Sequence, residues 1–86
     1  MIERTVTISS KSGLHARPAA VFVQSAKGFQ SQIKLSKNDK IVNGKSILSI
    51  LALGAEQGDQ VILQADGNDA EPAVSTLASL LEGDLG

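Results

Sequence analysis

The chain has 86 residues and a formal net charge of −1, and it contains no cysteine, tryptophan or tyrosine. This length predicts one domain, over residues 1–86, and the lack of cysteine excludes disulfides and thiolate metal sites. With two aromatic residues, both phenylalanine, the chain has neither the basic excess nor the stacking surface typical of nucleic-acid-binding proteins.

The apolar stretches predict a cytoplasmic protein that does not enter a membrane. Glu3 and Arg4 carry charge where a signal peptide would need an apolar stretch. The longest apolar stretch, residues 47–55, is too short to span a bilayer. The absence of cysteine also suits a reducing compartment.

The first third of the chain predicts a strand followed by a helix. Residues 3–9 alternate between apolar and polar side chains, which is typical of a half-buried strand. Residues 10–14 form a loop, in which Gly13 can adopt a positive φ. Pro18 has no backbone N–H and is tolerated only in the first turn of a helix, so the helix should begin at His15 or Ala16. We expect it to run to Lys27, with Gly28 as the C′ residue that closes it.

The rest of the chain predicts three more strands and two more helices. Residues 31–36 and 40–43 form a hairpin around a turn at 37–40. Ser46 before an apolar run that ends at Gly54 predicts a short capped helix. Residues 60–66 alternate again, and the segment 67–69 forms a turn and a cap before a last helix that Gly83 closes. The order β-α-β-β-α-β-α predicts an α+β domain, with the helices on one face of a mostly antiparallel sheet.

His15 is the only histidine, and it lies at the predicted start of the first helix. The free N–H groups and positive dipole end of a helix favour an anion at this place. Imidazole can carry a phosphoryl group covalently, and a transferred phosphoryl group mainly needs positioning and charge stabilisation. Arg17 could donate hydrogen bonds to phosphate oxygens. The alternatives are that His15 merely caps the helix and that Arg17 is a solvated residue of its first turn.

Two motifs in this strand order resemble the HPr family of phosphocarriers of the bacterial phosphoenolpyruvate:sugar phosphotransferase system. Residues 13–20 (Gly-Leu-His-Ala-Arg-Pro-Ala-Ala) resemble the active-site motif of the family, and residues 45–48 (Lys-Ser-Ile-Leu) resemble its regulatory-serine motif. Residues 26–29, 53–54 and 57–58 also match, so the similarity covers essentially the full length. The resemblance implies an HPr-like open-faced β-sandwich, in which three helices lie on one face of a four-stranded antiparallel sheet.

The resemblance also implies a phosphocarrier that is not an enzyme with turnover of its own and that uses no cofactor or metal. His15 would accept a phosphoryl group on Nδ1 from phospho-Enzyme I and transfer it to IIA domains of sugar permeases. Arg17 would assist, and the helix N-terminus formed by Ala16, Arg17 and Pro18 would stabilise the phosphate. Because a carrier must release its group, we expect His15 to be exposed.

Ser46 has two interpretations. As an N-cap it would stabilise its helix by about 0.5–2 kcal/mol. The resemblance implies regulatory phosphorylation, which would add a kinase/phosphorylase and a catabolite-control regulator to the partners. A phosphate adds about −1.5 to −2 charges, which a helix N-terminus tolerates and an acidic partner docking beside it does not.

An exposed apolar patch with a polar rim near His15 is the expected docking surface for transient partners of a monomer. The residues assigned to it are Ala20, Gln24, Lys27, Lys45, Ile47, Leu48 and Leu51. Gly44, Ser49 and the two leucines depart from the residues commonest in the family, and all four are expected on this surface. Two alternative functions stay open, a regulatory relative that acts through Ser46 and a small interaction domain with an incidental histidine.

Overall fold

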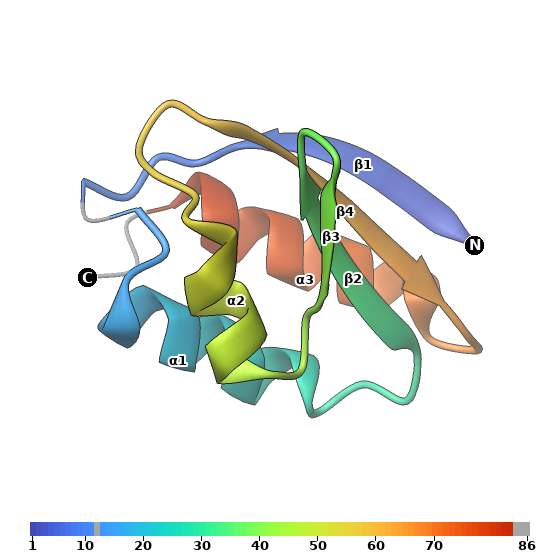
Figure 1. Ribbon diagram of the computed structural model, residues 1–86. Helices are drawn as coiled ribbons and strands as arrows, with labels where there is room; N and C mark the ends of the chain where they lie inside the picture. The colour runs from blue at the N-terminus through green and yellow to red at the C-terminus, as the bar shows by residue number, and fades with distance from the viewer. Residues whose placement is uncertain (12, 84–86) are drawn as a thin grey trace.

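The computed structural model describes residues 1–11 and 13–83, and it confirms the predicted element order (Figure 1). The seven elements are β1 (Ile2–Thr7), α1 (Ala16–Ala26), β2 (Gln32–Lys37), β3 (Lys40–Asn43), α2 (Ile47–Leu53), β4 (Gln60–Asp66) and α3 (Ala70–Glu82). Most of the predicted boundaries lie within two residues of those observed.

The strands form one antiparallel sheet in the order β1-β4-β2-β3. Val6 lies opposite Val61, and Leu35 lies opposite Leu63. Alternate residues of a strand face opposite sides, so this register places all four buried side chains on the same face of the sheet. The predicted alternation is thereby confirmed.

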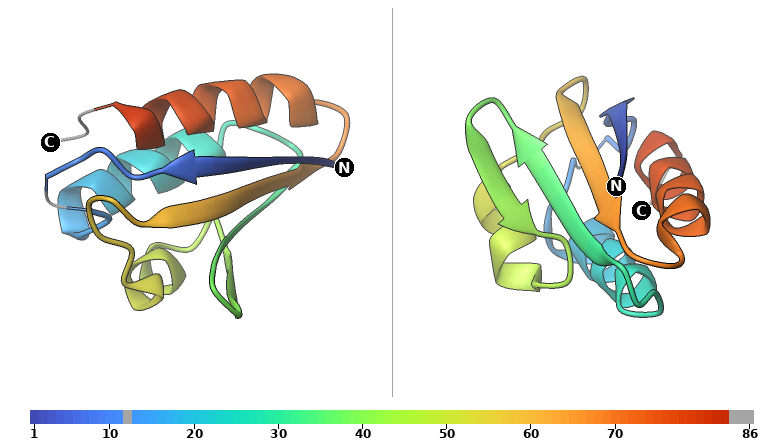
Figure 2. Two further views of the ribbon diagram at one scale, coloured as in Figure 1. Left: turned by 90° about the horizontal axis from the view of Figure 1, so that it is seen from above. Right: turned by 90° about the vertical axis from the view of Figure 1, so that its right-hand side faces the viewer.

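The helices cover one face of this sheet, as the resemblance implied (Figures 1 and 2). Helix α3 packs on β1 and β4, α2 packs on β2 and β3, and α1 contacts both other helices. Phe22 of α1, Ile50 of α2 and Leu77 of α3 are fully buried in the shared core. Within the described part of the chain, no helix is long and apolar enough to cross a bilayer.

The end of α1 differs from the prediction. The helix ends at Ala26, and Lys27 is a C-cap with right-handed backbone angles of −65° and −19°. The amide of Gly28 donates to the carbonyl of Ser25 at 3.0 Å, and Gly28 is not among the glycines with positive φ. The chain leaves α1 through a tight right-handed turn, so the conformational freedom of glycine is not needed at this position.

Gly44 is not on a surface, contrary to the expectation from the sequence. It is buried, and its amide donates to the carbonyl of Ile33 at 2.7 Å. A Cβ at position 44 would lie 2.5 Å from Cγ2 of Ile33. The close approach of the chain to β2 therefore explains why a glycine stands here.

Asp69 precedes α3, but its side chain makes no capping hydrogen bond. Its carboxylate instead accepts hydrogen bonds from the amide of Gln30 at 2.8 Å, the amide of Ser31 at 2.9 Å and the hydroxyl of Ser31. The hydroxyl of Ser31, followed by the amide of Gln30, lowers the pKa of Asp69 below its usual value. The residue predicted as a cap therefore fastens the start of β2 to the start of α3.

Asp69→Asn is expected to destabilise the fold in a pH-dependent way. A carboxylate whose pKa is lowered by folding stabilises the folded state at pH values above its pKa in the unfolded chain, near 3.8. This stabilisation is lost as the pH falls through the pKa of the folded state. The midpoint of urea unfolding should therefore fall at pH 7 and match that of the parent at about pH 2. Asp39→Asn, in the exposed hairpin turn, is the control. An equal loss at both pH values would contradict the role of the charge.

Candidate functional site

His15 is the N-cap of α1 and presents an exposed imidazole. Its backbone is extended, with φ −82° and ψ −168°, and its carbonyl accepts the first helical hydrogen bond from the amide of Ala19 at 2.8 Å. The imidazole makes no capping hydrogen bond, and the side chain is 65% exposed. The predicted exposure is confirmed. The alternative in which the ring serves only to cap the helix has no supporting contact.

The first turn of α1 offers donors beside this ring. The amides of Ala16 and Arg17 have no acceptor within a helix that begins at Ala16, whereas Pro18 has no N–H to donate. Pro18 is buried and holds the first turn against the core. The side chain of Arg17 is exposed and forms no ion pair or hydrogen bond with any residue that the structure describes. An anion on His15 would therefore meet two amides that have no acceptor among the described residues, and an exposed guanidinium.

The loop between α2 and β4 packs directly on the residues before His15. Gly13 has a φ of +63°, as predicted, and a Cβ there would lie 2.6 Å from the carbonyl oxygen of Ala55. The same carbonyl accepts a hydrogen bond from the amide of Leu14 at 2.9 Å. Beside His15 this packing leaves a shallow hollow of about 240 Å³, whose lining includes Glu56. One carboxylate oxygen of Glu56 lies 3.8 Å from Nε2 of His15.

A lysine of β2 fastens this loop. Nζ of Lys37 lies 2.9 Å from Oδ2 of Asp59 and donates to the carbonyl of Gly54 at 3.1 Å. Oδ2 of Asp59 also accepts from the amide of Glu56 at 2.9 Å. The hydrogen bond from Lys37, followed by that from the Glu56 amide, lowers the pKa of Asp59. These contacts could not be predicted from the sequence because no local pattern links β2 to a loop about twenty residues further along.

Ser46 caps α2, as predicted. Its hydroxyl accepts a hydrogen bond from the amide of Ser49 at 3.3 Å, and Gly54 closes the helix with a φ of 69°. The neighbouring Lys45 is half-buried, and its ammonium donates to the carbonyl of Phe29 at 2.6 Å. Ser46 is half-buried with its hydroxyl engaged as the helix cap, and the charge of Lys45 is engaged within the fold.

The predicted docking surface is exposed along α1 and α2, except for Lys45, which is half-buried. Leu48 is 77% exposed, Ile47 39% and Leu51 37%. A hollow of about 520 Å³ lies where the two helices meet, and its lining includes Ala20, Gln24, Lys27 and Ile47. The exposure of these residues is confirmed, and their role in docking stays a prediction.

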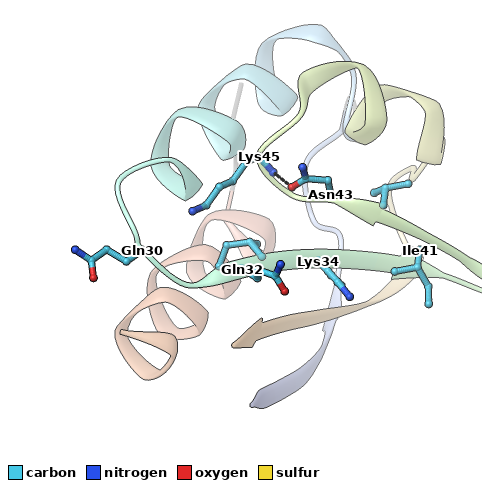
Figure 3. A pocket seen from close by; sticks show the side chains of 8 residues that line it. Gln30, Gln32, Lys34, Ile41, Asn43 and Lys45 are labelled. Carbon is cyan, nitrogen blue, oxygen red and sulfur yellow. Dashed lines mark hydrogen bonds between the residues drawn. The ribbon is translucent and has the colours of Figure 1, made fainter. Parts of the chain in front are cut away.

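A third hollow, of about 490 Å³, lies at the end of the β2–β3 hairpin that is away from its turn (Figure 3). The figure shows amide and lysine side chains around it, among them Gln30, Gln32, Lys34 and Asn43. The amide of Lys45 donates to Oδ1 of Asn43 at 2.9 Å. Among the described residues that line this hollow there is no Ser, Thr, Cys or His. Within the described residues, no three His, Cys, Asp or Glu side chains come together as metal ligands do.

Comparison with known proteins agrees with this geometry. A family model described as "PTS HPr component phosphorylation site" matches residues 2–83. The chain belongs to the HPr family of phosphocarriers. The match includes His15, the amides that follow it and Ser46.

The HPr-family relatives include both carriers and an HPr-like protein. The phosphocarrier protein HPr of Neisseria meningitidis is 40% identical over 86 residues, which are 100% of this chain and 97% of that protein. The HPr-like protein Crh of Halalkalibacterium halodurans is 42% identical over 82 residues, 95% of this chain and 98% of the relative.

Solved HPr structures share the fold. HPr-C-His from Thermoanaerobacter tengcongensis superposes with a TM-score of 0.92 at 52% identity, covering 95% of this chain and 92% of that one. An HPr dimer from the same species gives a TM-score of 0.79 at 51% identity, covering 100% of this chain and 99% of that one. The open-faced sandwich that the resemblance implied is thus the fold of this chain.

Proposed function

We propose that this chain accepts a phosphoryl group on His15 from phospho-Enzyme I and passes it, in the cytoplasm, to IIA domains of sugar permeases. The observation that supports this proposal is an exposed imidazole at a helix N-terminus, with no hydrogen bond to any residue that the structure describes. The lone pair of Nδ1 forms the bond to phosphorus while the bond to the donor breaks. The donor keeps the electron pair of that bond and takes up the proton that the ring releases. Because the chain only holds the phosphoryl group until a second protein accepts it, it has no turnover of its own.

The surroundings suit a group that is held briefly. The amides of Ala16 and Arg17 and the guanidinium of Arg17 can meet the phosphate oxygens, while Pro18 positions the turn. A helix N-terminus contributes about 0.3–1 kcal/mol to an exposed anion. Stabilisation of this size orients the phosphoryl group without trapping it, which is what transfer to a second protein requires.

A relay assay tests the proposal. The chain is incubated with Enzyme I and labelled phosphoenolpyruvate, and a panel of IIA domains is then added. We expect acid-labile label on the chain, followed by its movement to at least one IIA domain. Label that never leaves the chain, or that resists acid, would contradict a carrier role. Light scattering of the purified chain alone tests the expected monomer against a dimer.

We also propose that Ser46 is a site of regulatory phosphorylation, and Ser46→Asp mimics part of its charge. The added charge lies at a helix N-terminus beside the exposed Ile47 and Leu48, so it should repel an acidic partner without harming the fold. We expect phosphoryl transfer to His15 to slow about tenfold at low salt, with a melting temperature near that of the parent.

Ser75→Asp, which adds the same charge on an exposed position of α3, is the control for this variant. Unchanged phosphoryl transfer in Ser46→Asp, or equal slowing in both variants, would contradict the proposal that a charge at position 46 repels the partner.

A regulatory role through Ser46 without transfer is the second candidate function. It is favoured by the similarity to the HPr-like protein Crh and by the position of Ser46 at the start of α2. The relay assay separates the two candidates, because a purely regulatory relative can dispense with His15.

A further inference from the structure

Glu56 faces the imidazole of His15 from a separate part of the chain. Its carboxylate oxygen lies 3.8 Å from Nε2, the ring nitrogen that is not the proposed acceptor, and its side chain is 73% exposed. At this distance the pair is an electrostatic contact and not a hydrogen bond. Among the described residues, Glu56 therefore places a negative charge close to the ring of the proposed phosphoryl acceptor.

The backbone of Glu56 is held in this position from two sides. Its amide donates to Oδ2 of Asp59 at 2.9 Å, and the amide of Asp59 donates to the carbonyl of Glu56 at 2.9 Å. On the other side, a Cβ on Gly13 would lie only 2.7 Å from Cα of Glu56, so the two backbone segments are in direct contact. The carboxylate thus stays within reach of His15 even though its side chain is solvated.

We propose that Glu56 tunes the phosphoryl group of His15 by charge repulsion, raising its tendency to leave for the next acceptor. This inference rests on the proposed carrier function. Glu56 does not touch the reacting nitrogen and is not a catalytic residue. Its negative charge counteracts the stabilisation that Arg17 and the helix amides provide.

The charges around the ring favour this assignment. The negative charge of Asp59, the next acidic residue of the loop, is paired with Lys37 at 2.9 Å. Arg17 is the cation on the helix side, and Glu56 is the anion on the loop side. A change in phosphorylation when the charge of Glu56 is removed should therefore be due to Glu56 and not to Asp59.

The size of the effect follows from Coulomb's law in water. A carboxylate about 6 Å from a dianionic phosphoryl group should shift the phosphorylation equilibrium about fivefold at about 0.05 M salt. Screening at about 1 M salt should reduce this shift to less than twofold. The shift is clearest near pH 9, above the range in which imidazole rings ordinarily ionise.

A competition experiment measures this shift directly. Isotope-labelled parent chain and unlabelled Glu56→Gln are mixed with a trace of Enzyme I and limiting phosphoenolpyruvate until the phosphorylated fractions are constant. Intact-mass spectrometry then gives the phosphorylated fraction of each chain in the same tube. An equilibrium depends only on the free and phosphorylated forms, so changes in docking to Enzyme I cancel.

We expect the equilibrium to favour phosphorylated Glu56→Gln over the parent about fivefold at low salt. Glu56→Asp, which keeps the charge, should stay close to the parent. Glu71→Gln, which makes the same change in the exposed first turn of α3, should not shift. Equal phosphorylation of Glu56→Gln and parent, or a shift that persists unchanged at high salt, would overturn the role of Glu56. If no chain is phosphorylated at all, the proposed carrier function fails instead.

Discussion

His15→Ala is expected to abolish acid-labile phosphorylation completely and to leave the stability of the fold unchanged. His15 is the only histidine of the chain, so no second imidazole can take its place. Its ring makes no capping hydrogen bond, and its side chain is 65% exposed, so truncation removes little packing and no cap. Labelled phosphoenolpyruvate with Enzyme I measures the first effect, and thermal unfolding measures the second.

Two results would contradict this expectation. Acid-labile label that persists in His15→Ala would place the acceptor elsewhere in the chain. A large fall in the melting temperature would mean that the ring is part of the packing, which its exposure argues against. The parent chain, assayed beside the variant, shows that the donor is active.

Gly13→Ala is expected to lower the free energy of unfolding by about 3 kcal/mol, or the melting temperature by about 15 °C. A non-glycine residue is strained at the φ of +63° that Gly13 adopts. The added Cβ would also lie 2.6 Å from the carbonyl oxygen of Ala55 and 2.7 Å from Cα of Glu56, so backbone must move. Calorimetry or chemical unfolding measures the loss.

Gly54→Ala is the matched control for this variant. Gly54 has nearly the same backbone conformation, with a φ of +69°, but a Cβ there would have no atom within 4 Å. Its substitution should cost only the backbone strain, about 1 kcal/mol. Equal losses in both variants would show that the contact between Gly13 and the loop is not tight.

The secondary structure could be predicted because its signals are local. Pro18 places the start of α1 within one turn, and Ser46 with Gly54 brackets α2. Strand alternation identifies the buried face, and the register observed between Leu35 and Leu63 follows from burying it. The end of α1 lies one residue before the predicted end, and Gly28 follows the C-cap Lys27 as the predicted C′ residue, without a positive φ.

The contacts between distant segments could not be predicted in this way. Asp69 looked like a helix cap, yet its carboxylate binds the backbone around Ser31. A sequence pattern can indicate that a polar side chain needs a hydrogen-bond partner, but it does not identify which of several distant partners the side chain contacts.

The same limit applies to the site. The motif around His15 predicted the exposed imidazole, and the structure confirms that exposure. Glu56 lies forty-one positions further along the chain, outside both motifs, and no periodic pattern connects the two residues. Its place beside Nε2 comes from the packing of Gly13 on the loop and from the tie between Lys37 and Asp59.

The most direct test of a carrier function is to observe the bond that His15 is proposed to form. The chain is labelled with ¹⁵N-histidine, and its imidazole resonances are recorded before and after addition of Enzyme I and phosphoenolpyruvate, and again after a IIA domain. We expect phosphorus coupling to appear at Nδ1 of His15 and to disappear when the IIA domain is added. An imidazole spectrum that does not change while Enzyme I is fully phosphorylated would contradict the account.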